Sequence, residues 1–166
     1  MRTITKLWIL GLLGALLVCC NSSQTSKTVA QALLKHYQTG QFKSVTGLFL
    51  PQSEAYRVAE IVGAPKDFLK IKGVEGEANY QARIMDILKA KRNGFKIHWA
   101  QTKFEKIIVK STKKHLESLE TQEVLLLFKG KTLFQQPIKL VKFKGNAYLW
   151  EVGEFDRFRA PKSTKV

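Results

Sequence analysis

The amino-acid sequence predicts an α+β domain in which N-terminal helices pack on an antiparallel sheet. Up to about residue 92, apolar side chains recur every three or four positions, which is the period of an amphipathic helix. From Phe95 onward they recur every second position or in short continuous runs, which is typical of strands. Short glycine-containing turns separate these later runs, so the strands should connect as hairpins. An α+β domain has this order of elements, with helices followed by hairpin-connected strands.

The helical part contains four predicted segments joined by short breaks. The expected helices cover residues 27–38, 41–50, 52–62 and 78–92. Gly40 ends the first segment because glycine readily takes the left-handed conformation that follows a last helical turn. Pro51 stops the second, and Gly94 ends the fourth. Residues 66–76 are expected to form a loop.

The strand part begins at once after Gly94. The expected strands cover residues 95–99, 107–109, 124–128, 132–143 and 148–152, the second continuing the first after a bend. The run 124–128 is apolar throughout, as in a strand that is buried on both faces. A turn is expected at 129–131, a kink at Pro137 and a hairpin at Gly145. Residues 161–166 form a polar tail.

The first 19 residues predict an export signal. Arg2 and Lys6 precede twelve residues, 7–18, that carry no charge. A membrane-spanning helix needs about 20 apolar residues, so this run is too short to cross a bilayer but suits the hydrophobic region of a signal peptide. The alternative, a short buried helix, is disfavoured because every face of the run is apolar.

Both cysteines stand at the end of this signal. The segment Leu17-Val18-Cys19-Cys20 resembles the lipobox of bacterial lipoproteins, in which a cysteine receives diacylglycerol. The resemblance implies lipid attachment at Cys20, with Cys19 as the alternative site, because Cys19 stands where Gly, Ala or Ser is usual. It also implies a membrane-anchored protein of the bacterial cell envelope, facing the periplasm or the surface. Palmitoylation of the pair, or its removal with the signal, stays open. The expected organisation is a signal peptide (1–19), a lipidated tether (20–26), one domain (27–160) and the tail.

The domain itself resembles a known superfamily in its order of elements. Residues 28–34 with Tyr37 and 40–42 are similar to the opening helix of the nuclear-transport-factor-2-like superfamily, and 145–150 to its final hairpin. The resemblance covers about residues 27–158. It implies a strongly bent sheet whose concave face is covered by the helices, so that the domain is cone-like. A cystatin-like domain, with fewer helices on its sheet, would share the pattern.

Charge is the strongest functional signal in the sequence. There are 28 Lys and Arg against 13 Asp and Glu, a net charge of +15, and the chain without its signal keeps +13. The basic residues concentrate in 89–114 and 129–144, which an antiparallel sheet can bring together. The lysines expected to form one anion-binding face are Lys96, Lys103, Lys106, Lys110, Lys139 and Lys142. Expected partners are anionic lipid, acidic glycan or an acidic envelope protein.

Two other interpretations of the charge were weighed. Lysines can simply solvate strands and protect sheet edges from pairing. Nucleic acid is not expected as a partner, because arginine is scarce and no recognition motif occurs.

A cavity in the cone is the alternative site. His98 is expected to share a strand face with Lys96, and if that face is internal, it approaches Glu151 as an acid–base pair. We expect instead that the two side chains are separated or face solvent. Trp99, Tyr148 and Trp150 either line a pocket with them for an apolar or planar ligand, or fill the core.

No catalytic residue, metal site or cofactor is assigned from the sequence. No two histidines are spaced by four residues, and no phosphate-binding glycine loop or nucleophile motif is present. The function expected is therefore a lipid-anchored, non-catalytic binding or assembly module. The alternative is a small-molecule-binding protein or an enzyme that uses the cavity.

Overall fold

The computed structural model describes residues 24–64, 73 and 75–158, and shows an α+β fold. Its helices are α1 (Ser26–Thr39), α2 (Gln52–Val62) and α4 (Glu77–Gly94), and its strands are β1 (Lys103–Leu116), β2 (Leu119–Lys129), β3 (Leu133–Phe143), β4 (Asn146–Val152) and β5 (Asp156–Arg157). The predicted signal peptide, Cys19, Cys20, the greater part of the predicted loop 66–76 and the tail lie outside the described residues. No helix in the described part of the chain is both long and apolar enough to cross a bilayer.

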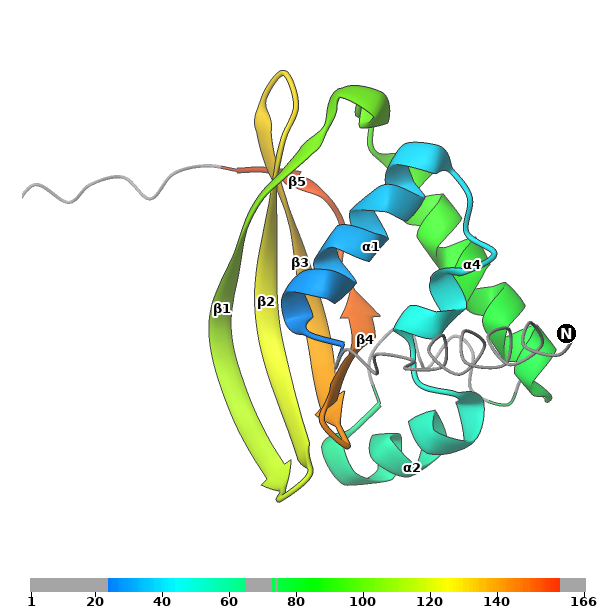
Figure 1. Cartoon of the computed structure of the whole chain (residues 1–166). Coiled ribbons are helices and arrows are strands. Elements are labelled where there is room, and N and C mark those ends of the chain that lie inside the picture. Colours follow the sequence, from blue (N-terminus) through cyan, green and yellow to red (C-terminus); the bar gives the residue numbers. More distant parts are fainter. Residues whose placement is uncertain (1–23, 65–72, 74, 159–166) are drawn as a thin grey trace, which may run out of the picture.

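The strands form one antiparallel sheet in the order β1-β2-β3-β4. The sheet curves around α1, with α4 on the same side beyond it (Figure 1). β4 pairs with the C-terminal half of β3, from Ile138 to Phe143. The chain then leaves the ladder and returns as β5, which pairs with Phe134 and Gln135 near the start of β3.

Helix α1 follows its sequence signals closely. The Thr25 side chain accepts a hydrogen bond from the backbone N–H of Thr28, and the Thr28 hydroxyl accepts one from the backbone N–H of Thr25. This reciprocal capping satisfies donors that the first helical turn leaves free. Gly40 ends the helix with φ of 68°, the left-handed region that favours glycine.

The predicted helix 41–50 is wrong. Only a short 3-10 turn, Val45–Leu48, forms there. Phe42, Val45 and Leu48 still point into the core, which explains the helical spacing of the apolar residues. The segment cannot continue as a helix because Phe49 is extended and pairs with Leu149 of β4.

The predicted strand 95–99 is also wrong. Residues 95–98 form an extended connection from α4 to a 3-10 turn, Trp99–Gln101, and they join no sheet. The alternation has another cause: Phe95 and Ile97 pack against the core while Lys96 and His98 are exposed. The predicted strand 107–109 lies within the longer β1.

An aromatic cluster fills the core at the end of the sheet where β5 returns. Tyr37 of α1 contacts Trp99 and Phe155, with ring centroids 4.9 and 5.2 Å apart. The Tyr37 hydroxyl accepts a hydrogen bond of 3.0 Å from Nε2 of the fully buried Gln136, whose Nε2 also donates to the carbonyl of Gly153. These contacts tie α1, β3 and the segment after β4 into one unit.

Candidate functional site: a basic cleft

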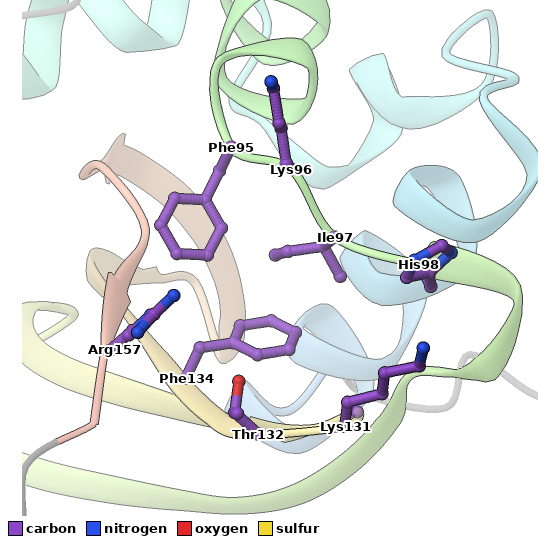
Figure 2. A pocket seen from close by; sticks show the side chains of 9 residues that line it. Phe95, Lys96, Ile97, His98, Lys131, Thr132, Phe134 and Arg157 are labelled. Carbon is purple, nitrogen blue, oxygen red and sulfur yellow. The ribbon is translucent and has the colours of Figure 1, made fainter.

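A cleft of about 280 Å³ lies at the end of the sheet where β2 turns into β3 (Figure 2). Three separate segments enclose it: the connection after α4, the β2–β3 turn with the start of β3, and β5. The lining residues are Phe95, Lys96, Ile97, His98, Gly130, Lys131, Thr132, Phe134 and Arg157.

The floor of the cleft is apolar and aromatic. The rings of Phe95 and Phe134 lie 6.2 Å apart, and Phe134 is almost fully buried. Phe134 also contacts Trp99 edge-to-face, with 6.2 Å between the centroids. The floor is therefore an extension of the aromatic core, and its half-buried Phe95 and Ile97 offer a planar or apolar group a surface to pack on.

The rim of the cleft is basic. Lys96, His98, Lys131 and Arg157 line it, and no Asp or Glu of the described ranges does so. Figure 2 shows Lys131 and Arg157 on opposite sides of Phe134, whereas Lys96 points away from that ring. Within the described part of the chain, neither lysine nor Arg157 forms an ion pair. The cleft thus combines uncompensated positive charge with an aromatic floor.

The position of Arg157 depends on the chain segment that follows β4. The backbone N–H of Gly153 donates to the carbonyl of Pro137 at 2.8 Å. Lys91, buried in α4, donates to Glu154 at 3.0 Å. Beyond these contacts β5 aligns Arg157 opposite Phe134.

The other two walls are held by hydrogen bonds to backbone carbonyls. In the β2–β3 turn, the N–H of Gly130 donates to the carbonyl of Thr132 at 3.1 Å. The hydroxyl of Thr102 donates to the carbonyl of His98, also at 3.1 Å. These bonds fix the two segments that carry Lys131 and His98.

The six lysines expected on one basic face do not lie on one face. β2 separates β1 from β3, and the alternation of side chains along β3 places Lys139 and Lys142 on opposite sides of the sheet. Lys139 is paired with Glu151 at 3.7 Å and Lys142 with Glu120 at 2.8 Å. Of the remaining lysines, Lys103 and Lys106 lie on the same side of the sheet as Lys139, Lys110 lines a groove together with Lys139, and Lys96 lies outside the sheet.

The five residues of the expected aromatic pocket are also dispersed. Trp99 is buried in the core, and Tyr148 is half-buried against it. His98 lines the cleft, whereas Trp150 and Glu151 line a different groove. No contact joins His98 to Glu151 among the described residues, which agrees with the expected separation of that pair.

The groove beside Trp150 has a volume of about 440 Å³ and lies near the end of α2. Most of its polar side chains, apart from Lys113, are already paired with one another. His115 Nε2 lies 2.9 Å from the hydroxyl of Thr121, and Ser111 donates to Glu123 at 3.1 Å. Because these groups have partners within the domain, the groove offers less unsatisfied chemistry than the cleft.

Lys131, Phe134 and Arg157 were missed as site residues by the sequence interpretation. The turn around Lys131 was recognisable, but no local signal shows that the chain after β4 returns to the start of β3. In the ranges 24–64 and 75–158, no three His, Cys, Asp or Glu side chains gather closely enough to hold a metal ion. No protein-family model, curated protein or solved structure matches this chain.

Proposed function

We propose that the protein is a lipid-anchored envelope protein whose domain binds, without catalysis, a small anionic molecule that carries a planar or apolar group. The site is the cleft described above. The anionic group would lie between Lys131 and Arg157, and the apolar group would pack on Phe95 and Ile97. Such a ligand would be both the anionic partner expected from the charge and the small molecule expected for a cavity.

One observation carries the proposal: positive charge without partners surrounds an aromatic floor. Elsewhere the lysines of β3 and the β3–β4 turn are neutralised by acids at 3.7 Å or less, namely Lys139, Lys142 and Lys144. At the cleft, no carboxylate from the described part of the chain lines the wall, so a bound anion would supply the missing charge. His98 is the one lining residue that commonly acts as a base, and without a carboxylate to orient it the cleft favours binding over catalysis.

The proposal includes a cone-like domain of the nuclear-transport-factor-2-like type. A curved sheet with α1 on its inner side supports this architecture (Figure 1). In such a domain, the cleft would stand at the open end of the cone, where the β2–β3 turn and the connection after α4 meet.

The proposed anchor is a diacylglycerol thioether at Cys20. Cys20→Ala should abolish lipidation and leave the protein mis-sorted, because the thioether requires the cysteine sulfur, whereas Cys19→Ala should be tolerated. The measurement is the intact mass of the N-terminal peptide from membrane-associated protein. An unmodified Cys20 in membrane-associated wild type would refute the anchor but leave the cleft proposal standing.

The cleft is tested with two probes of similar shape and different charge. The mature chain with Cys20→Ser, which carries no lipid, is titrated with 8-anilinonaphthalene-1-sulfonate and with the uncharged N-phenyl-1-naphthylamine. We expect the anionic probe to bind more tightly. Binding is measured by energy transfer from Trp99, which contacts the floor at Phe134. Raising the salt concentration should weaken this binding, because the Debye length falls from about 10 Å at 0.1 M to about 3 Å at 1 M.

Charge-reversal variants locate the binding. Lys131→Glu and Arg157→Glu should each weaken binding of the anionic probe several-fold, since an exposed charge pair contributes up to about 1 kcal/mol, or about fivefold, and the reversed charge also repels the probe. Lys35→Glu on α1 is the matched control, because it makes the same charge change at an exposed site away from the cleft. Equal losses in all three variants would show that only net charge matters, and the proposal would fail.

A further inference from the structure

The described chain begins at a defined place on the domain. The backbone N–H of Gln24 donates to Oδ1 of Asn146 at 2.9 Å, and the carbonyl of Gln24 accepts from the N–H of Ala147 at 2.7 Å. Asn146 and Ala147 are the first residues of β4, directly after the β3–β4 turn. The N-terminal segment therefore enters the fold at this turn.

The cleft and the Gln24 contacts lie at opposite ends of β3. The cleft residues 130–132 come directly before Leu133, the first residue of β3. The residues that contact Gln24 come after Phe143, the last residue of β3. With a rise of about 3.3 Å per residue, the eleven residues of β3 separate the two ends by about 33 Å. Only three residues stand between Cys20 and Gln24, and a chain of that length spans at most about 14 Å. A lipid on Cys20 would therefore hold the Gln24 end of the domain close to the bilayer.

The surface around Gln24 carries more positive than negative charge. Lys27 and Lys114 are exposed, and the two hairpin turns adjoin there because the N–H of Lys144 donates to the carbonyl of Ser118. Two acids of this region are already neutralised: Lys144 pairs with Glu54, and Glu120 pairs with Lys142. Glu117, at the tip of the β1–β2 turn, is exposed, and no ion pair involves it among the described residues.

We infer that this anchor end, formed by Lys27, the β1–β2 turn and the β3–β4 turn, rests on the anionic headgroups of the bilayer, so that the cleft opens away from that bilayer. The inference rests on the lipid anchor of the proposed function. Each lysine close to an anionic surface strengthens binding by about fivefold, which is about 1 kcal/mol. The ligand of the cleft is then a molecule dissolved in the adjoining compartment, and not a headgroup of the membrane that holds the chain.

Lysine footprinting on the wild-type lipoprotein tests this arrangement. The protein is reconstituted on vesicles of phosphatidylglycerol and phosphatidylcholine, or on phosphatidylcholine alone, and is acetylated with a water-soluble reagent before peptide mass spectrometry. We expect Lys27, Lys114 and Lys144 to lose reactivity on the anionic vesicles, while Lys131 reacts as it does in detergent. Protection of Lys131, or uniform protection of all lysines, would overturn the inference.

A double variant separates electrostatic contact from proximity. Because Lys144 is paired with Glu54, Lys27→Gln with Lys144→Gln should lower the contact constant by between about fivefold and about 25-fold and so restore the reactivity of Lys114. Lys35→Gln, one charge removed elsewhere on α1, is the control and should leave Lys114 protected. If Lys114 stays protected in the double variant, the anchor end does not rest on headgroups through these charges. The cleft proposal is judged separately by the probe titration, whose failure would not change the footprint.

Discussion

Gly153 is the residue at which a single methyl group should most disturb the segment that carries Arg157. A Cβ atom added at Gly153 would lie 2.6 Å from Cγ and 2.8 Å from the carbonyl oxygen of Pro137. Carbon atoms in favourable contact stand about 3.5–4.0 Å apart, so β3 and the segment after β4 must separate by roughly 1 Å. The carbonyl cannot move alone, because it belongs to the backbone of β3 and accepts the 2.8 Å hydrogen bond from Gly153.

The expected loss of stability in Gly153→Ala is about 2–3 kcal/mol. Overpacking typically costs about 1–3 kcal/mol, and weakening the Gly153 hydrogen bond adds up to about 1 kcal/mol. For a domain of this size, the melting temperature should fall by about 2–4 °C per kcal/mol, or roughly 5–10 °C, in thermal unfolding followed by circular dichroism. The affinity of the cleft for its anionic probe should fall as well, since β5 follows the displaced segment.

Gly47→Ala provides the matched control for this experiment. No atom lies within 4 Å of a Cβ built at Gly47, and neither glycine has a left-handed φ. Its stability should change by less than about 1 kcal/mol, in the stabilising direction, because alanine restricts the unfolded chain. Equal melting temperatures for Gly153→Ala and Gly47→Ala would refute the reasoning from close packing.

Three further expectations concern stability. Burial, and secondarily the charge of Glu77, raise the pKa of Tyr80, so the unfolded chain loses the phenolic proton above about pH 10 while the folded chain keeps it. Stability should therefore decline as the pH rises through that value, and urea midpoints of Tyr80→Phe should lack this decline. Tyr37→Phe should cost about 1–3 kcal/mol in urea unfolding, because buried Gln136 loses one of its two hydrogen-bond partners; an unchanged midpoint would contradict this. Thr25→Ala should cost about 1 kcal/mol, which Thr25→Ser recovers if the loss comes from the N-cap.

The sequence predicted well those elements whose ends are set by neighbouring turn and capping residues. The helix 52–62 has the same limits in the structure, since Pro51 precedes it and Gly63 follows it. The strand predicted at 132–143 is β3, Leu133–Phe143, which ends at the glycine turn before β4. Turn residues and caps act on their immediate neighbours, so their effect can be judged without the rest of the fold.

The two elements that the sequence predicted wrongly failed for a common reason. Apolar spacing reports which side chains are buried, but not which backbone groups find partners. Residues 95–98 pack Phe95 and Ile97 against the core as a strand would, yet no strand pairs with them among the described residues. Phe49 has the spacing of a helix, and its pairing with Leu149 makes it extended.

By itself, the sequence determined the α+β class, the order of helices before strands, the large positive charge and the motif that motivates the lipid anchor. These follow from composition and from periodicities that act over a few residues. Only the tertiary structure decided which charges remain unpaired and where they gather. Lys142 is neutralised by Glu120 across a strand pair, whereas Lys131 and Arg157 meet at the cleft because β5 returns to β3. Such encounters join distant parts of the chain, and they depend on pairing between strands, which no local pattern specifies.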